Sequence, residues 1–597
     1  MCAQSSRFVH HFVNPVIGVL TIALSVPVVH AQITSGGPIF DRGPRNPGTV
    51  AADNNCPLNQ PGVDDGPTKF AVPGNNCIDI DQPPAPAGNP PADGAGNLIG
   101  ETTNPANAFN FATQPLSIMW FQALSIFETV ASVQGAARIP TEPIVGLGPS
   151  FNSNSCLSCH SAPAVGGSSP GSVSIVTKSG GSPVIFNMPL EPPFSGNPEL
   201  AAAADQGGTS INPTFPSGSS VSGVGFTDVP VNGPVIEVRF VNGLAASGNA
   251  AAVQPGGVGE LFTFQGRSDA PAGCSISQLN FGGVGSKSLG FRIPTPTYGL
   301  GLVENTPELT LLNNLASNPS NPNAAAAAAL GITGSFNRSG NDGTITRFGW
   351  KAQNKSLLIF AGEASNVEMG VTNELFPNEK TFGSGPSCIP NNQPEDEILP
   401  AGFPPAVGDP SVMSANTQNN AVFMRLNGAP SQCDAVASYT LNPYGTAGVA
   451  LCDPFGAVAS SDVLLGQQVF NSPKIGCALC HTPTQTTGPS PNASLSNQTY
   501  HPYSDFAIHN MGSGLSDGVT QGSAGPTQFR TAPLWGLGQR IFFFHDGRDT
   551  DLVNVIQDHC PIASTTSTDE ACGSINAFNT LLTQTQQQAL IDFLRSL

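Results

Sequence analysis

Charged residues are scarce in this sequence, and basic residues are the scarcest of them. Only 10 % of the 597 residues are charged, and 21 Lys and Arg stand against 40 Asp and Glu, which gives a net charge of −19. Nucleic acids and anionic membranes are bound through basic patches. The composition therefore argues against both kinds of partner.

Long apolar runs are also lacking, except at the start of the chain. The first 31 residues combine Arg7, the apolar run VNPVIGVLTIALSVPVV and the small-residue sequence VHA, which is the pattern of a secretory signal. An uncleaved membrane anchor is the alternative, but Pro15 and Pro27 interrupt the run. We therefore predict a signal peptide over 1–31, no transmembrane segment in the mature chain, and a periplasmic or secreted location.

Two short motifs stand out from this sparse background. SNSCLSCHSAP at 153–163 and KIGCALCHTP at 474–483 each contain C-x-x-C-H. This pattern is typical of c-type haem attachment, in which two thiols bind the haem vinyl groups and the histidine is the proximal iron ligand. A zinc site or a redox dithiol does not require that histidine. The motifs predict two covalently bound haem c groups, held by Cys156, Cys159 and His160, and by Cys477, Cys480 and His481.

Histidine is rare, and its distribution separates the two expected haems. Between residues 32 and 455 the only histidine is His160, so the first haem has no second histidine in its own region. The second haem has several nearby in sequence, namely His501, His509, His545 and His559. This asymmetry predicts one reactive haem, whose sixth position is open or weakly held, and one electron-transfer haem. Met369 is the side chain we expect at that sixth position if it is filled.

Eight cysteines remain outside the signal and the two motifs. An even number in an oxidising compartment favours disulfides. Neighbours in sequence are the natural pairs, and they leave Cys274 to pair with Cys388. The expected pairs are therefore Cys56–Cys77, Cys433–Cys452, Cys560–Cys572 and Cys274–Cys388.

The chain divides into an irregular arm and two haem regions. With 67 Gly and 56 Pro, much of the chain must be loop. Apolar spacing predicts helices over 115–133, over 461–471 with Ser461 or Asp462 as the cap, and over 583–597, while VIEVRFV at 235–241 alternates like a strand. We predict a mainly α fold with long irregular loops, a little β structure and two cytochrome c-like modules. The expected parts are the signal (1–31), a Pro/Gly-rich arm (32–104), an N-terminal haem domain with long insertions (105–455) and a C-terminal haem domain (456–597).

An internal repeat supports two related modules. FRIPTPTYGLG at 291–301 is similar to FRTAPLWGLG at 529–538. RFGWKAQNKSL (347–357) follows the first copy and FFFHDGRDTDL (542–552) follows the second. In these two segments Trp350 and His545 each precede a leucine by seven residues.

With these motifs the chain resembles the bacterial di-haem cytochrome c peroxidase superfamily, and within it the di-haem oxidoreductase branch, which is also described as thiol oxidoreductase-like. The similarity rests on the haem motifs, the repeated segments, VEMGVT (367–372) and YSDFAIHNMGSGLSDG (503–518), and it spans about 110–597. Rubber oxygenases look like more distant relatives.

The resemblance implies roles for particular residues. Fourteen residues after the histidine of HDG, the superfamily places the distal ligand of the C-terminal haem, and that position is His559; the alternatives are a surface histidine there and His509 as the ligand. Glu368 matches the acid/base over the open face of the N-terminal haem, unless it is a solvated loop acid. Trp350 matches an aromatic group between the haems, although a core tryptophan would also fit. Where peroxidases have a glutamine, ten residues before Glu368, this chain has Leu358.

Arg292 and Arg530 are expected to bind haem propionates, because a guanidinium makes paired hydrogen bonds with carboxylates. We also keep Ca²⁺ as a candidate cofactor. The leading functional hypothesis is a secreted oxidoreductase that reacts with hydrogen peroxide and receives electrons from a small cytochrome or cupredoxin. The alternatives are an oxygenase that uses dioxygen on an external organic substrate, and an inert electron-transfer cytochrome.

Overall fold

The structure is a computed structural model that describes residues 39–41, 289–379, 386–396, 415–429, 460–560 and 569–597, together with shorter pieces between 69 and 274. The predicted signal over 1–31 lies outside the described residues, as does most of the arm. Within the described part, no helix is long and apolar enough to cross a membrane.

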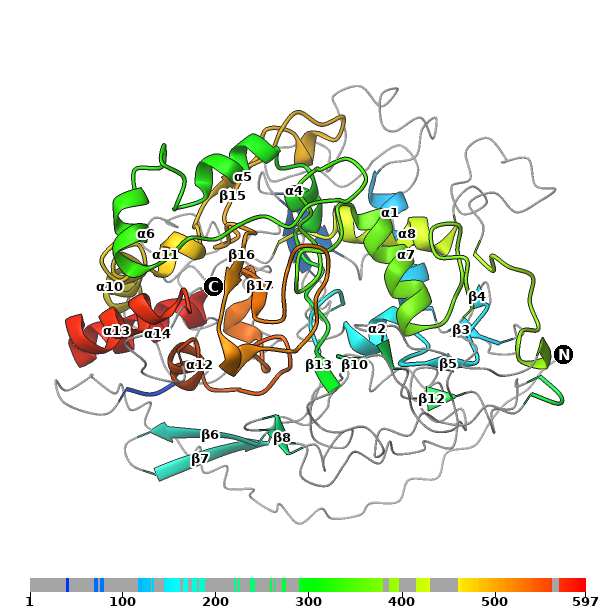
Figure 1. Cartoon of the computed structure of the whole chain (residues 1–597), viewed down its shortest axis with the longest axis horizontal. Helices are drawn as coiled ribbons and strands as arrows, with labels where there is room; N and C mark the ends of the chain where they lie inside the picture. Colours follow the sequence, from blue (N-terminus) through cyan, green and yellow to red (C-terminus); the bar gives the residue numbers. More distant parts are fainter. Residues whose placement is uncertain are drawn as a thin grey trace, which may run out of the picture.

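The helices of the N-terminal half include the first motif, which forms α2. They are α1 (Leu116–Glu128), α2 (Cys156–Cys159), α4 (Leu300–Glu304), α5 (Glu308–Asn314), α6 (Ala324–Leu330), α7 (Leu357–Glu368) and α8 (Asn416–Leu426). The helix predicted over 115–133 is confirmed as α1, and it buries Trp120, Ala123, Leu124 and Phe127 at helical spacing. In Figure 1, α1, α2, α7 and α8 gather at one end of the molecule.

Helices of the C-terminal half lie at the other end in Figure 1. They are α10 (Ser460–Phe470), α11 (Cys477–Cys480), α12 (Leu552–Asp558), α13 (Cys572–Leu581) and α14 (Gln584–Ser596). The predicted helices over 461–471 and 583–597 are confirmed as α10 and α14. However, α10 begins at Ser460, so Ser461 and Asp462 lie within its first turn and the expected cap there was wrong. Thr583 caps α14 by a capping box with Gln586.

The first and last helices of the C-terminal half, α10 and α14, pack closely on each other. Gly466 makes this approach possible, because a Cβ there would lie 1.9 Å from the Ala589 carbonyl oxygen. Phe470 and Phe593 meet in the apolar cluster between the two helices. The arm reaches this cluster, where Asp41 forms an ion pair with Arg595 of α14.

Strands are short and pair mostly as two-stranded sheets. The pairs are β1 (Lys69–Val72) with β2 (Asn76–Asp79), β3 (Ala131–Ser132) with β4 (Ile144–Val145), β5 (Ser150–Phe151) with β12 (Phe262–Thr263), β6 (Ser174–Ser179) with β7 (Ser182–Asn187), β8 (Ser220–Val221) with β9 (Val224–Gly225), β14 (Gln485–Thr486) with β15 (Thr499–Tyr500), and β16 (Ile508–Asn510) with β17 (Gln528–Arg530). β10 (Glu237–Phe240), the strand predicted over 235–241, pairs with β11 (Val258–Gly259) and with β13 (Leu289–Arg292). The prediction of a mainly α fold with a little β structure is confirmed.

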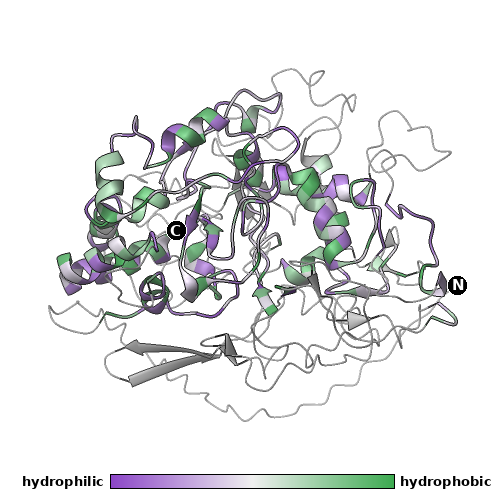
Figure 2. Cartoon of the chain, in the orientation of Figure 1, coloured by the Kyte–Doolittle hydropathy of each residue, from purple (hydrophilic) through white to green (hydrophobic). Residues whose placement is uncertain are grey.

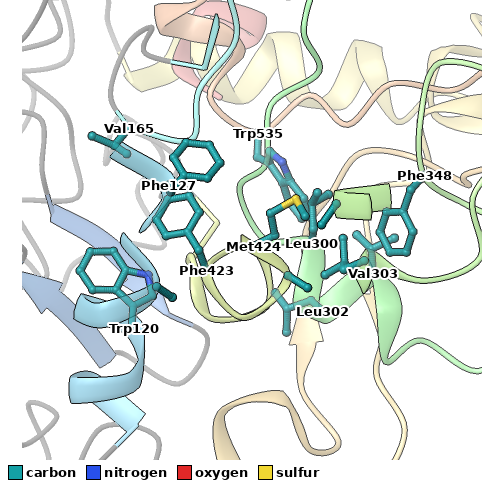
Figure 3. Packing of buried hydrophobic residues seen from close by; sticks show 14 of the residues in the cluster. Trp120, Phe127, Val165, Leu300, Leu302, Val303, Phe348, Phe423, Met424 and Trp535 are labelled. Atoms are coloured by element: carbon teal, nitrogen blue, oxygen red, sulfur yellow. The ribbon is translucent and has the colours of Figure 1, made fainter. Parts of the chain in front are cut away.

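One apolar cluster joins the two halves. It contains Trp120, Phe127 and Phe423 from the N-terminal half and Trp535 from the C-terminal half, and Figure 3 shows Trp535 beside Leu300 and Met424. Helices in Figure 2 carry both hydrophobic and hydrophilic residues, as helices with one buried face do. The two halves therefore share a core.

Two of the four expected disulfides are confirmed. Cys274 pairs with Cys388, and Cys560 pairs with Cys572. The other two pairs involve Cys56, Cys77, Cys433 and Cys452, whose side chains lie outside the described residues. The four cysteines of the C-x-x-C-H motifs form no disulfides.

Candidate functional site

The first C-x-x-C-H motif forms one helical turn, α2, that ends at His160. Nδ1 of His160 lies 3.0 Å from the Gly167 carbonyl oxygen. Nδ1 therefore carries the ring proton and donates a hydrogen bond to that oxygen. Burial lowers the pKa of His160 to about 4, against the opposing effect of this hydrogen bond. The ring is therefore neutral at pH 7 and its Nε2 has a lone pair for a metal, the arrangement that second-shell carbonyls impose on ligand histidines.

A cavity adjoins His160. One face of α7 forms a wall of this first cavity, through Phe360, Glu363, Ala364, Val367 and Glu368. Strands and loops add the remaining polar wall, with Asn152, Glu237, Arg239, Arg292 and Gln353.

Glu368 belongs to a buried carboxyl pair in this cavity. Its side chain is hydrogen-bonded to that of Glu237, and its Oε2 accepts a hydrogen bond of 2.8 Å from Asn152 Nδ2. Burial raises the pKa of Glu368 well above its ordinary value, and the charge and hydrogen bond of Glu237 raise it further. Burial also favours the neutral form of Glu237, but Arg239 and the hydrogen bond with Glu368 lower the pKa of Glu237 to about 2. The pair therefore holds one proton, on Glu368.

The second motif forms α11, and His481 follows it as His160 follows α2. Its Nδ1 lies 3.0 Å from the Tyr503 carbonyl oxygen, and burial, helped by the nearby His559, lowers the pKa of His481 to about 4. His559 caps the C-terminal end of α12, with Nδ1 2.7 Å from the Val555 carbonyl oxygen. Both histidines line a second cavity. In both, the Nδ1–H is bound to a backbone carbonyl, which leaves Nε2 as the nitrogen for a metal.

His509, the alternative ligand, also lines this second cavity but is held differently. Its Nδ1 lies 2.8 Å from Glu570 Oε2, and its Nε2 lies 3.0 Å from Asp505 Oδ2. An imidazole between two carboxylates donates from both nitrogens and has no lone pair left for iron. This geometry favours His559 over His509 as the ligand.

The internal repeat is visible in the backbone. Phe348 bridges to Asn354 in the first copy, and Phe543 bridges to Asp549 in the second. Both turns contain a residue in the left-handed region, Ala352 with φ +51° and Gly547 with φ +70°. Helix α7 begins three residues after the first bridge and α12 three residues after the second, at Leu357 and Leu552.

This correspondence identifies the counterpart of His559. His559 is the seventh residue after Leu552, and the seventh residue after Leu357 is Ala364. Both residues line the cavity of their own half. The first cavity therefore has a methyl group where the second has an imidazole. Met369, expected as a sixth ligand, packs instead in an apolar cluster with Leu147, Phe151 and Val371.

Trp350 lines both cavities. Its indole Nε1 donates a hydrogen bond of 2.8 Å to the Ile293 carbonyl oxygen, and its ring meets that of His545 edge-on, with ring centroids 6.4 Å apart. His545 in turn stacks on Phe529 at 4.4 Å. An aromatic path thus connects the walls of the two cavities.

The two arginines expected to bind propionates differ in their partners. Arg292 lines the first cavity, but it forms a buried ion pair with Asp517 and donates to Gln521, so its donors are already engaged. Arg530 lines the second cavity, and its buried Nε has no hydrogen-bond partner. Burial lowers the pKa of Arg530 to about 10, and the neighbouring charge of Arg540, on the same cavity wall, adds to this.

Several residues of these walls were missed from the sequence. Glu237 and Arg239 lie at alternate positions of VIEVRFV, and a strand with charged residues on one face was the available signal. Gln353 lines the first cavity, whereas Leu358, at the expected glutamine position, packs against the shared core. Arg540 carries no motif signal. No group of three or more His, Cys, Asp or Glu side chains in the described residues is arranged to hold a metal ion, so the candidate Ca²⁺ has no such site there.

Comparison with known families gives one decisive match. The family described as "Di-haem oxidoreductase, putative peroxidase" matches residues 276–387 and 427–597. Over these segments the chain matches the di-haem oxidoreductase family. The resemblance inferred from the motifs is confirmed. A search of curated proteins finds no match.

Solved structures show only distant similarity to this chain. The hydrazine synthase of Kuenenia stuttgartiensis is 16 % identical, over 31 % of this chain and 57 % of that one, with a TM-score of 0.18. The diheme peroxidase BthA of Burkholderia thailandensis E264 is 16 % identical, over 42 % of this chain and 65 % of that one, with a TM-score of 0.24. A MauG-like protein associated with microbial copper homeostasis is 13 % identical, over 51 % and 90 % of the two chains, with a TM-score of 0.23. The chain thus spans 57 % and 65 % of the length of the first two.

The di-haem family implies two haem groups, and the two cavities fit them. Each adjoins a C-x-x-C-H motif whose histidine has Nε2 as its metal-binding nitrogen. The second cavity also contains Arg530, whose buried Nε has no partner and suits an anionic propionate.

Proposed function

We propose that this protein is a periplasmic or secreted di-haem c-type oxidoreductase that reduces hydrogen peroxide at its first cavity and receives electrons through its second. Haem iron supplies the one-electron chemistry, as it does in peroxidases generally. The disulfides and the signal-like N-terminus support the extracytoplasmic location.

The difference between the two cavities is the observation that carries the proposal. The second has two neutral histidines, His481 and His559, which suit a six-coordinate, low-spin haem with no room for substrate. The first has His160 and, at the place of the second histidine, Ala364. A protein that only carried electrons would not need an open distal face with a protonated carboxyl beside it.

Charge on the cavity wall favours peroxide over an organic substrate. Glu237, Arg239, Glu363 and Glu368 all line the first cavity. An apolar hydrocarbon would leave these groups without water or partners, at a high cost in free energy. Peroxide is small and hydrogen-bonding, and it suits such a wall. The oxygenase remains the second candidate because Leu358 occupies the glutamine position of peroxidases.

Each residue then has a defined task. Cys156, Cys159, Cys477 and Cys480 attach the two haems, and His160 and His481 are the proximal ligands. Glu368 holds a proton that it can donate to the leaving oxygen of peroxide, as a general acid. Trp350 connects the two cavities for electron transfer. Arg530, with Arg540, neutralises the propionates of the second haem, while Arg292 supports the wall of the first through its ion pair with Asp517.

The decisive experiment measures haem content and reactivity together. A pyridine haemochrome assay should give two c haems per chain. Cyanide or peroxide should perturb the Soret band of one haem only, and peroxide should oxidise a reduced donor cytochrome. Glu368→Gln should keep both haems while peroxide turnover falls by about 10²-fold or more, as expected when a general acid is lost. Stable dioxygen binding, or product formation without peroxide, would favour the oxygenase, and two unreactive haems would leave only an electron carrier.

His559→Gly tests the assignment of the second cavity. Loss of the imidazole should convert the C-terminal haem from low to high spin, and the spectrum of the other haem should not change. Electronic absorption and electron paramagnetic resonance spectra report both. If His509→Gly caused this conversion instead, the assignment of His559 as ligand would be wrong.

A further inference from the structure

The partner of Glu368 comes from a strand that the sequence motifs do not include. β10 pairs antiparallel with β13, with Glu237 opposite Arg292. Side chains alternate along a strand, so Glu237 and Arg239 point to the cavity, while Val238 and Phe240 are fully buried in the core. The strand thus presents an anion and a cation side by side beneath the end of α7.

Arg239 holds Glu237 through two contacts. Its Nε donates to Glu237 Oε1 at 2.6 Å, and its Nη2 donates to Oε2 at 3.3 Å. A guanidinium that contacts both oxygens of a carboxylate stabilises the ionised form. Glu237 is therefore fixed as the anion of the pair.

Glu368 is held equally firmly from the opposite side. Its backbone carbonyl accepts hydrogen bonds from Asn152 N at 2.7 Å and from Ser153 N at 3.1 Å, in addition to the Asn152 side-chain contact with Oε2. Two hydrogen-bonded carboxyl groups require one proton between them. Because Arg239 fixes Glu237 as the anion, that proton belongs to Glu368.

We propose that Glu237 and Arg239 are positioning residues that keep Glu368 protonated beside the first haem and return a proton to it after each transfer. This inference rests on the proposed function of Glu368. In the hydrogen-bonded pair, Glu237 is the acceptor while Glu368 is the donor. When Glu368 releases its proton, two carboxylates face each other, and their repulsion favours the uptake of one replacement proton from solvent water onto the pair.

Other charged groups also face the pair. Arg292 comes from β13 and Glu363 from one turn earlier in α7, and both line the same cavity. The charge of Arg292 helps to keep Glu237 ionised, and the charge of Glu363 acts on Arg239. Glu363 accepts a hydrogen bond from Asn354, on the far side of the turn that carries Trp350. Glu374 provides the control, because its side chain is exposed six residues after Glu368 and is not part of the cavity wall.

Two substitutions should move the protonation of Glu368 in opposite directions. Glu237→Gln removes the neighbouring anion and leaves Arg239 to attract the Glu368 carboxylate, so Glu368 should lose its proton about one pH unit lower or more, a tenfold change in the equilibrium. Arg239→Met removes the cation, so the pair should retain protons to higher pH. Infrared spectroscopy of the holoprotein measures this directly, through the C=O band of the protonated carboxyl group, which Glu368→Gln should abolish.

The pH dependence of the peroxide reaction should follow the infrared titration. In Glu237→Gln the pH at which the rate of the peroxide reaction falls on the alkaline side should move down by the same amount. This variant should still bind two haems. In Glu374→Gln the band and the alkaline fall in rate should remain where they are in the parent protein. The proposal is overturned if both Glu237→Gln and Arg239→Met retain the parent titration, or if both move it in the same direction.

Failure of this inference can be told apart from failure of the proposed function. If the parent protein does not react with peroxide, or if Glu368→Gln reacts as fast as the parent, the proposed function of Glu368 is wrong whatever the infrared band shows. If Glu368→Gln is slow but Glu237→Gln titrates and reacts like the parent, only the role of Glu237 and Arg239 is wrong.

Discussion

At the scale of single residues, His509 shows how a histidine near a haem site can be structural. It is buried between Asp505 and Glu570 and lies 3.7 Å from the sulfur of Cys480. Burial opposes its protonation, but Cys480 and Asp505 raise the pKa of His509 well above its usual value. Burial also opposes ionisation of Glu570, but His509 lowers the pKa of that carboxyl to about 2.

These two shifts give a pH window for stability. The contribution of His509 is fully present below its unfolded pKa of 6.5 and is lost as pH rises through the higher folded value. The contribution of Glu570 is fully present above its unfolded pKa of 4.5 and is lost as pH falls towards about 2. Both contributions are therefore complete between pH 4.5 and 6.5.

His509→Gln should lower the free energy of unfolding by about 3–5 kcal/mol near pH 5.5, because it leaves two buried carboxylates facing each other. The difference from the parent should shrink at alkaline pH. Denaturant unfolding at several pH values measures it. The control is His501→Gln, because His501 is exposed and its ring contacts the Thr484 hydroxyl. If the unfolding free energies of His509→Gln and the parent differed by the same amount at every pH, His509 would not stabilise the protein through its charge between Asp505 and Glu570.

Among single residues, those with local motifs were the predictable ones. C-x-x-C-H identifies His160 and His481 because its five residues are contiguous in the chain. His559 was found through its spacing from His545. The two carboxylates that hold His509 lie four and 61 positions away, and Glu237 lies far from Glu368 in sequence. Contacts of this kind depend on the fold, and no local pattern encodes them.

At the scale of elements, the end of α7 is joined to the segment that precedes the first motif. Gly148 N donates to the Met369 carbonyl oxygen at 2.8 Å, next to the bonds that hold the Glu368 carbonyl. Gly370 has φ +70°, and a Cβ there would lie 2.6 Å from the Gly148 Cα. Gly148 and Gly370 therefore allow the backbone before the first motif to lie against the backbone at the end of α7. This contact sets the position of Glu368.

Gly370→Ala should destabilise the protein by more than the roughly 1–2 kcal/mol that a left-handed conformation costs alanine, since the methyl group also clashes with Gly148. Gly331→Ala is the matched control, because Gly331 has φ +77° and open space around it. Unfolding free energies of the two variants isolate the clash. Gly370→Ala should also slow the peroxide reaction as Glu368 is displaced. Equal destabilisation of the two variants would contradict the close approach.

The Cys560–Cys572 disulfide joins the end of α12 to the start of α13, directly after His559. Replacing both of these cysteines with serine should lower the unfolding free energy by about 3 kcal/mol. Replacing Cys274 and Cys388 should lower it by about 4.7 kcal/mol, because the Cys274–Cys388 disulfide closes the longer loop. Only the first pair should shift the C-terminal haem towards high spin. Calorimetry and absorption spectra measure the two effects. If replacing Cys274 and Cys388 also changed the spin state of the C-terminal haem, the change could not be attributed to displacement of His559.

Helices with regular apolar spacing were predictable for a physical reason. The buried residues of α1 and the apolar stripe of α14 repeat every three or four residues, and the helical period alone produces that pattern. The helix start at Ser460 was missed because α10 includes two residues that are also good caps. The pairing of β10 with β13 could not be predicted, since the register between distant strands is set by packing in three dimensions.

At the scale of the whole molecule, the two halves function together because they share walls. The core in Figure 3 combines side chains from both, and Trp350 belongs to both cavities. The internal repeat accounts for the difference between the two cavities. The same turn and helix carry Trp350 and Ala364 in one half and His545 and His559 in the other, so two positions distinguish the proposed substrate cavity from the proposed electron-transfer cavity.

From the net charge of −19 we predict that a basic electron donor associates with this protein faster than an acidic one. Opposite charges speed association at low salt, and the effect is lost as the Debye length falls from about 30 Å at 0.01 M to about 8 Å at 0.15 M ionic strength. Stopped-flow reduction by a basic cytochrome should therefore slow by about tenfold or more over this range. A neutral small-molecule reductant is the control and should reduce the protein at the same rate throughout. If an acidic cytochrome reacted as fast as the basic one at low salt, the donor would be recognised by packing at a local site and not by the overall charge.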